Sequence, residues 1–149
     1  MSIQEHTSPE KLERYSFLWT EVRLVIAAIA LFIGGVPPLL KITPYSLYGP
    51  MSSLLTIAWI ISGLSAAYLL YRWYKGGMNL FGTQNMQDKV TFLIATISGI
   101  NLGIVGLLRT NIGMNISSSY VIFIAVGCLY LWSTYYLYKR WKQFGERLF

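Results

Sequence analysis

The stretch VTFLIATISGINLGIVGLL occupies Val90–Leu108 and contains no Lys, Arg, Asp, Glu or His. Its length is close to the roughly 20 residues that an α-helix needs to cross about 30 Å of hydrocarbon. Its polarity does not alternate along the chain, as the polarity of a membrane-spanning strand would. Because lipid cannot hydrogen-bond an exposed backbone, the stretch predicts a transmembrane helix.

Three further stretches share this character, at Leu24–Leu40, Met51–Tyr71 and Ser119–Tyr138. The chain as a whole is 54% hydrophobic and 12% charged, whereas a soluble domain carries about a quarter charged residues. The charges are missing from long stretches rather than thinly spread. We therefore predict an all-α integral membrane protein with four transmembrane helices.

The basic residues predict the orientation of the chain in its membrane. Ten of the 12 Lys and Arg residues fall on the side that holds the N-terminus, and Lys41 and Arg109 fall on the other side. The positive-inside rule then places both termini in the cytoplasm, in a plasma or inner membrane. A basic cytoplasmic rim predicts contact with anionic lipid headgroups of the bilayer rather than with nucleic acid.

An internal repeat divides the chain. Residues 22–81 align without a gap with residues 90–149, and 15 of the 60 positions are identical, among them Arg72-Trp73 with Arg140-Trp141. Shared apolar composition alone would give about six identities. We predict two tandem parallel helical hairpins, at residues 22–81 and 82–149, related by a pseudo-twofold axis along the membrane normal. Residues 1–21 form a cytoplasmic segment that either lies along the interface as a helix or runs on into the first span.

Local signals predict where two helices begin and where one ends. Ser8-Pro9 is typical of a helix start, and Asn85 with Asp88 three positions later is typical of a capping arrangement. Pro37-Pro38 removes backbone donors, and we expect the first helix to end there, at the outer interface.

Few residues could carry chemistry within the membrane. Glu21 and Arg23 flank the start of the first apolar stretch, and we expect them to form an interfacial pair or to reach the headgroups. His6 and Cys128 are the single histidine and the single cysteine, which argues against haem ligation, metal binding and disulfide chemistry. The sequence predicts no catalytic residue, no metal ligand, no cofactor and no enzymatic activity.

Thr91, Ser98 and Asn101 form a polar stripe on the third span. The stripe either lines a path for a solute or provides hydrogen bonds between helices, and the second interpretation agrees with ordinary membrane-helix packing.

Small residues at four-residue spacing predict close helix packing, against the other spans or against a partner helix. They are Ala30, Gly34, Gly63, Ala67, Gly99 and Gly103. Aromatic and basic residues at the cytoplasmic ends predict interfacial anchors, namely Arg72, Trp73, Arg140 and Trp141.

Two functions fit these features. The first is a non-catalytic accessory or structural subunit of a larger membrane complex, with other membrane subunits or further copies of this chain as partners. The alternative is a small homo-oligomeric channel or transporter for a neutral or hydrophobic solute, for which the polar stripe that ends at Asn101 would form the lining.

Overall fold

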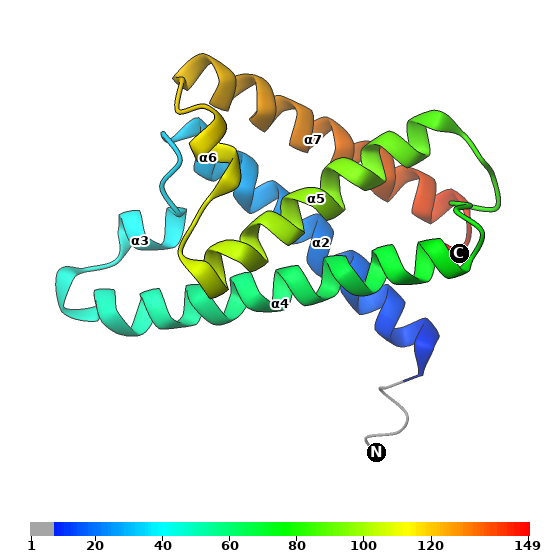
Figure 1. Ribbon diagram of the computed structural model, residues 1–149, viewed down its shortest axis with the longest axis horizontal. Coiled ribbons are helices and arrows are strands. Elements are labelled where there is room, and N and C mark those ends of the chain that lie inside the picture. Colours follow the sequence, from blue (N-terminus) through cyan, green and yellow to red (C-terminus); the bar gives the residue numbers. More distant parts are fainter. Residues whose placement is uncertain (1–7) are drawn as a thin grey trace.

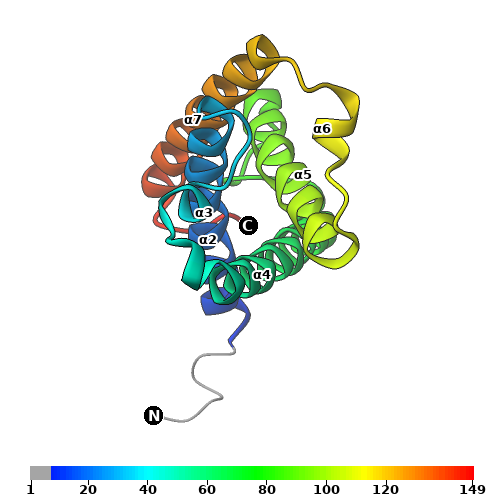
Figure 2. The ribbon, with the colours of Figure 1, turned by 90° about the vertical axis from the view of Figure 1, so that its left-hand side faces the viewer.

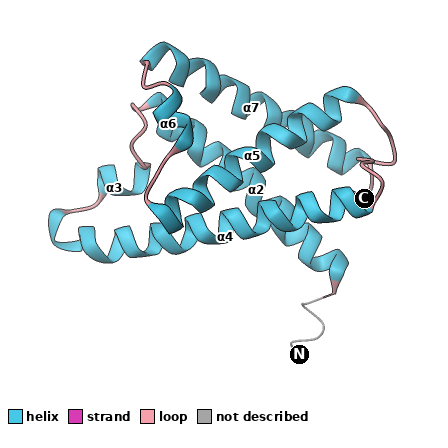
Figure 3. Cartoon of the chain, in the orientation of Figure 1, coloured by secondary structure: helices cyan, strands magenta, loops and turns pink. Residues whose placement is uncertain are grey.

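The computed structural model describes residues 8–149, and helices joined by loops make up this part of the chain (Figure 3). Four long helices are α2 (Pro9–Phe32), α4 (Tyr48–Lys75), α5 (Met86–Leu108) and α7 (Tyr120–Gln143); the short elements are α3 (Pro38–Ile42), the 3-10 helix η1 (Tyr45–Leu47) and α6 (Ile112–Ile116). Within residues 8–149, four helical segments are long and apolar enough to cross a membrane. The all-α class is confirmed, and the four helices that could cross a membrane lead us to treat the chain as an integral membrane protein.

The long helices form a bundle with two different ends (Figure 1). One end carries the start of α2, the connection between α4 and α5, and the C-terminus, and we call it the terminal end. The other, the loop end, carries α3 and α6. Figure 2 looks onto the loop end and shows the four long helices arranged around a centre, with α2 beside α7 and α4 beside α5. These two pairs have the most extensive helix contacts in the bundle.

Helix α2 begins earlier and ends earlier than the sequence predicts. Ser8 caps its start, since the Ser8 Oγ accepts from the Lys11 N–H at 3.4 Å, and Pro9 takes the first helical position as expected. The helix ends at Phe32 because Gly34 and Gly35 follow with φ of 90° and 81°, a left-handed conformation that favours glycine. The prediction that Pro37-Pro38 ends this helix is therefore wrong.

The other three spans lie where the sequence predicts them. Met51–Tyr71, Val90–Leu108 and Ser119–Tyr138 fall on α4, α5 and α7. Asn85 caps α5 as expected, because its Oδ1 accepts from the Gln87 N–H at 2.8 Å. The helical residues that begin at Pro9 continue into the span without a break, so residues 9–21 belong to α2. Residues 1–7, which include His6, lie outside the part of the chain that the structure describes.

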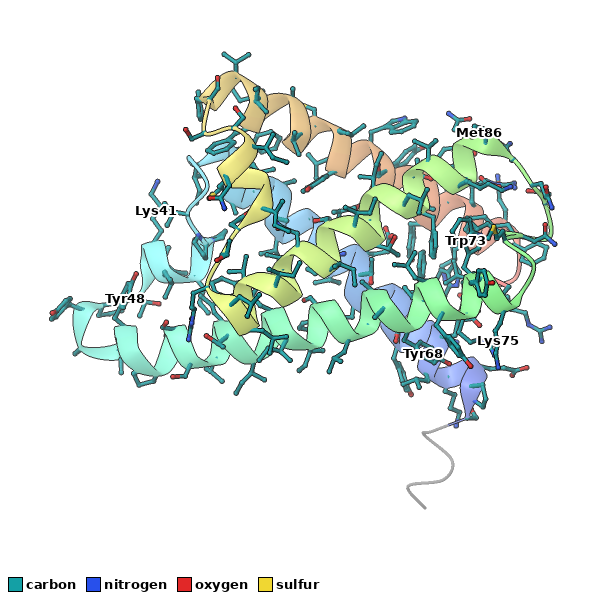
Figure 4. All side chains as sticks on the ribbon, in the orientation of Figure 1. Lys41, Tyr48, Tyr68, Trp73, Lys75 and Met86 are labelled. Atoms are coloured by element: carbon teal, nitrogen blue, oxygen red, sulfur yellow. The ribbon has the colours of Figure 1, made fainter. Side chains whose placement is uncertain are left out.

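The apolar core lies at the terminal end. Trp141 is only 2% exposed and packs on Phe17 with ring centroids 5.2 Å apart, and Trp73 packs on Phe92 at 5.5 Å. The expected anchoring role of Trp141 is therefore wrong, because aromatic partners on neighbouring helices draw its ring inward. The remaining large members of the core are Leu24, Leu69, Leu80, Phe81, Leu137 and Leu148. In Figure 4, Trp73 and Lys75 lie at the terminal end, and Lys41 and Tyr48 lie at the loop end.

Two carboxylates hold the arginines of this end. The fully buried side chain of Asp88 accepts two hydrogen bonds from Arg140, at 3.0 and 2.9 Å, and others from Tyr136 at 2.7 Å and Thr83 at 3.1 Å. Two parallel bonds from one guanidinium are a strong form of ion pair. Arg140 is thus held by an ion pair on the protein while its side chain stays partly exposed, and its role as an interfacial anchor stays a prediction.

Arg72 is held in a similar way on the other hairpin. Its Nη2 donates to Glu13 at 3.1 Å, and the second oxygen of Glu13 accepts from the Leu148 N–H at 3.1 Å. This arrangement ties α2, α4 and the C-terminal residues together, and the expected role of the half-buried Arg72 as an interfacial anchor stays a prediction.

Small residues let α4 and α5 approach closely. A Cβ on Gly63 would lie 2.7 Å from the Gly103 Cα, and a Cβ on Gly99 would lie 2.6 Å from the Ala66 Cβ. Two of the predicted packing residues, Ala67 and Gly34, do not lie in close helix contacts of this kind. Ala67 is exposed, because Ala66 is the residue that faces α5. Gly34 lies beyond the end of α2, so it forms no helical step with Ala30.

Candidate functional site

A cavity of about 450 Å³ lies in the half of the bundle nearer the loop end, between all four long helices. Its volume falls in the range of about 300–1,000 Å³ that is typical of small-molecule sites. Most of its wall is apolar, formed by Val22, Ile26, Ala27, Ala30, Leu31, Leu55, Ala58, Leu102, Val105, Met114, Phe123 and Val126. The arrangement suits the apolar part of a ligand.

Helix α6 closes the loop end of this cavity. Asn101 holds it in place, because the Asn101 Nδ2 donates to the Asn111 Oδ1 at 3.0 Å and its Oδ1 accepts from the Ile112 N–H at 2.9 Å. Met114 then reaches across to Gly35, where its methyl group takes the space that a Cβ would need. Asn101 thus has a definite structural partner, which sequence spacing alone could not reveal.

Arg23 lies at the opposite end of the cavity, in the middle of the bundle. It is about 21 Å along the helix axis from the first residue of α2, and it is only 5% exposed. Its Nη1 donates to the Ser98 Oγ at 3.1 Å and its Nη2 to the Ala95 carbonyl at 2.6 Å. Gly99 makes room for the guanidinium, since a Cβ there would lie 3.1 Å from Nη2.

The charge of Arg23 has no direct counter-ion among residues 8–149. None of their carboxylates lies within 4.0 Å of its nitrogens, and its Nε has no hydrogen-bond partner in that part of the chain. Glu21, two residues earlier, is 4% exposed, and both of its oxygens lack a donor among the same residues. Ionisable groups at such depth are costly and are usually functional.

This depth corrects the prediction for Glu21 and Arg23. The charge-free stretch begins after Arg23, so the sequence predicts that both residues lie at the membrane interface. The helix starts at Pro9 instead, so both side chains lie more than three turns inside it. The Ser8-Pro9 start was the signal in the sequence that could have placed them correctly.

Further polar groups gather around Arg23. The Trp19 Nε1 donates to the Ser62 Oγ at 3.0 Å, and Tyr130 also lines this end of the cavity. The end of the cavity near Arg23 is therefore polar and positively charged. Most of the remaining wall, toward α6, is apolar.

The predicted polar stripe divides into two parts. Ser98 and Asn101 line the cavity, the first beside Arg23 and the second beside α6. Thr91 does not line it; this buried side chain donates to the backbone carbonyls of Gln87 and Asp88, at 2.8 and 3.1 Å. Backbone bonding of this kind satisfies a hydroxyl within its own helix.

We compared the chain with known proteins. No family model, curated protein or solved structure gives a significant match. Function is therefore inferred from the cavity and the groups that line it.

Proposed function

We propose that this chain is a non-catalytic membrane protein that binds a hydrophobic or amphipathic small molecule inside its helix bundle. The observation that carries the proposal is the cavity of about 450 Å³ between α2, α4, α5 and α7. Binding of this kind is the step that a small transporter of hydrophobic solutes needs. It also suits a subunit that holds such a molecule for a larger assembly.

The apolar wall favours a ligand with a hydrocarbon part. Each Å² of apolar surface removed from water contributes roughly 25 cal/mol, and a ligand in the cavity would also contact wall atoms that otherwise face empty space. Trp19 and Trp59 both line the cavity, so their fluorescence reports its occupancy.

The experiment uses the full chain in lipid nanodiscs and bromododecane, a neutral quencher of tryptophan fluorescence. Ala30→Phe fills the cavity from α2, whereas Ala125→Phe makes the same change at an exposed position of α7 that does not line it. We expect saturable quenching in the wild type and in Ala125→Phe, and its loss in Ala30→Phe. Quenching without saturation in all three proteins would contradict the proposal.

We further propose that the terminal end faces the cytoplasm. Support comes from the ten Lys and Arg residues assigned to that side, and from the fact that the start of α2 and the C-terminus lie at one end of the bundle (Figure 1). Fusion of a reporter to the C-terminus, and separately to residue 113 in α6, tests this. Activity of a cytoplasm-dependent reporter only at residue 113 would reverse the orientation.

We also propose that the two helical hairpins are tandem copies of one repeat. The ends of α4 and α7 support this proposal. The Met78 N–H donates to the Trp73 carbonyl at 3.0 Å, and the Glu146 N–H donates to the Trp141 carbonyl at 2.9 Å. Gly77 and Gly145, at equivalent positions of the two copies, have φ of 73° and 71°. Superposition of the two hairpins in an experimental structure tests the repeat.

The accessory-subunit function stays a prediction. It is compatible with the cavity, since a bound amphiphile could serve a neighbouring subunit. Recovery of other membrane proteins at fixed stoichiometry with the extracted chain would support it.

A further inference from the structure

We infer that the ligand of this cavity is a single-chain amphiphile with an anionic head group, such as a carboxylate, and that Arg23 binds this head group. The inference rests on the proposed function, because it names the class of molecule that the same cavity would hold. Three features of the cavity lead to it: a buried charge without a contacting carboxylate, the placement of the polar groups, and the available volume.

The buried charge without a contacting carboxylate belongs to Arg23; Glu21, two residues earlier, forms no hydrogen bond to it. The two terminal nitrogens of Arg23 donate to the neutral oxygens of Ser98 and Ala95, and no carboxylate in the described part of the chain forms an ion pair with it. A charge buried within a membrane bundle is costly unless an opposite charge or several hydrogen bonds accompany it. A bound anion would supply that opposite charge in a medium of low dielectric constant, where the attraction is strong.

Two half-buried arginines, Arg72 and Arg140, differ from Arg23 in their partners. Arg72 and Arg140 each have a carboxylate partner, at 3.1 and 2.9 Å, and neither lines the cavity. Arg23 lines the cavity and lacks such a partner. Among residues 8–149, the fully buried arginine is thus the one that lacks a contacting carboxylate and lines the cavity.

The placement of the remaining polar groups suits a head group at this end. Ser62, Ser98 and Tyr130 line the cavity close to Arg23, and hydroxyls can both donate to and accept from a bound anion or its associated water. From there most of the wall is apolar toward Met114 and Phe123; the amides of Asn101 and Asn111, which also line it near α6, bond to each other. A hydrocarbon chain would extend from Arg23 toward α6, so that each part of the molecule meets groups of its own polarity.

The volume favours one chain rather than two. About 450 Å³ lies in the lower half of the range for small-molecule sites, which suits a single hydrocarbon chain more closely than the two chains of a diacyl phospholipid. A small inorganic anion would leave the apolar wall without a partner. We therefore expect a single-chain amphiphile. Binding of a diacyl phospholipid or of a small inorganic anion in its place would contradict this assignment.

The experiment measures binding of dodecanoate and of dodecanol to the full chain in nanodiscs of zwitterionic lipid, by displacement of bromododecane from the cavity. The two probes share a chain and differ in the charge of the head group. Because a hydrogen bond to a charged group is stronger than one to a neutral group, we expect dodecanoate to bind about tenfold more tightly or better. Arg23→Gln should remove this preference, so that dodecanoate and dodecanol bind to the variant with similar affinity.

Arg109→Gln is the matched control for a general attraction of anions to the protein. Arg109 lies at the loop end, is exposed, and donates to the Thr56 Oγ1 at 3.0 Å, outside the cavity wall. This variant should keep the full preference for dodecanoate. The difference in affinity between dodecanoate and dodecanol is measured on the wild type alone. It therefore tests the inference even if Arg23→Gln does not fold.

The outcomes separate the two proposals. Equal binding of dodecanoate and dodecanol to the wild type would overturn the anionic head group and keep the cavity as an apolar site. Absence of saturable bromododecane quenching would overturn both. Displacement by sodium phosphate alone, or by anionic phospholipid added to the nanodiscs in place of dodecanoate, would overturn the assignment of a single-chain amphiphile.

Discussion

The two halves of the bundle differ in the partners of their charged side chains. At the terminal end, Asp88 with Arg140 and Glu13 with Arg72 form ion pairs inside an aromatic core. In the half nearer the loop end, Arg23 stands beside a cavity with neutral partners only. A fully partnered polar group stabilises one fixed arrangement of helices. A partly partnered group beside an open volume is instead suited to a ligand. We call the half at the terminal end the packed half and the half that contains the cavity the binding half, and variants in each half test the difference between them.

The largest effect is expected for Asp88→Ala in the packed half. The change removes the acceptor of Arg140, Tyr136 and Thr83 and leaves a guanidinium without its carboxylate. Asp88 is fully buried but Arg140 is partly exposed, so we expect a cost of about 3 kcal/mol, at the lower end of the range for breaking a buried ion pair. Unfolding in mixed micelles, followed by circular dichroism, measures this change in the free energy of unfolding. A loss below about 1 kcal/mol, as for an exposed pair, would contradict the structural role of Asp88.

A matched pair of alanines on α4 compares the two halves directly. Ala66 is fully buried against Gly99, whereas Ala58 lines the cavity. Ala66→Leu should lower the free energy of unfolding by about 2–3 kcal/mol, because overpacking forces the helices apart. Ala58→Leu should change it by about 1 kcal/mol or less, since the added methyl groups enter open space. Equal losses for the two variants would remove the distinction between the halves.

A smaller effect is expected for Gly63→Ala. The new Cβ would lie 2.7 Å from the Gly103 Cα, so α4 and α5 must separate slightly, at a cost of about 1–2 kcal/mol. Gly49→Ala is the control at the start of the same helix, because no described atom outside its own turn lies within 4 Å of a Cβ there. Alanine's higher helix propensity should make this control neutral or slightly stabilising. The same unfolding measurement applies, and a stabilised Gly63→Ala would contradict the close approach of the two helices.

The smallest effect concerns pH. A hydrogen bond from Lys142, together with the charge of Arg14 at 2.8 Å, lowers the pKa of Glu146 below its usual 4.5. The folded protein therefore binds a proton at Glu146 less readily than the unfolded chain does. The resulting stability is present above about pH 4.5 and is lost as the pH falls through the lowered pKa. Melting temperatures between pH 3 and 6 should fall less steeply on acidification for Glu146→Gln than for the wild type, and identical slopes would contradict the pair.

The sequence predicts much of the scaffold and little of the site. Long charge-free stretches locate α4, α5 and α7, because only helices satisfy a lipid-exposed backbone. The same criterion misplaces the first span. A charge normally marks the membrane boundary, but Ser98 and the Ala95 carbonyl let Arg23 lie well inside. These partners are more than 70 positions away along the chain, so sequence spacing cannot show them.

Packing decides the other differences. Trp141 is amphipathic and could face headgroups, but Phe17 on α2 offers a ring at 5.2 Å and buries it. Gly34 matches a packing motif in spacing alone, because the helix has already ended at Phe32. The cavity itself depends on α6 being held by Asn101, a contact across the loop end. Such features require the relative positions of helices, which no pattern in one helix contains.

The most direct test of the binding half is native mass spectrometry of the chain extracted from its own membrane in mild detergent. We expect the wild type and Ala125→Phe to carry one single-chain anionic amphiphile, and Ala30→Phe to lose it because the cavity is filled. A bare chain in all three proteins, or the same bound mass in Ala30→Phe, would contradict the account of the cavity as a ligand site.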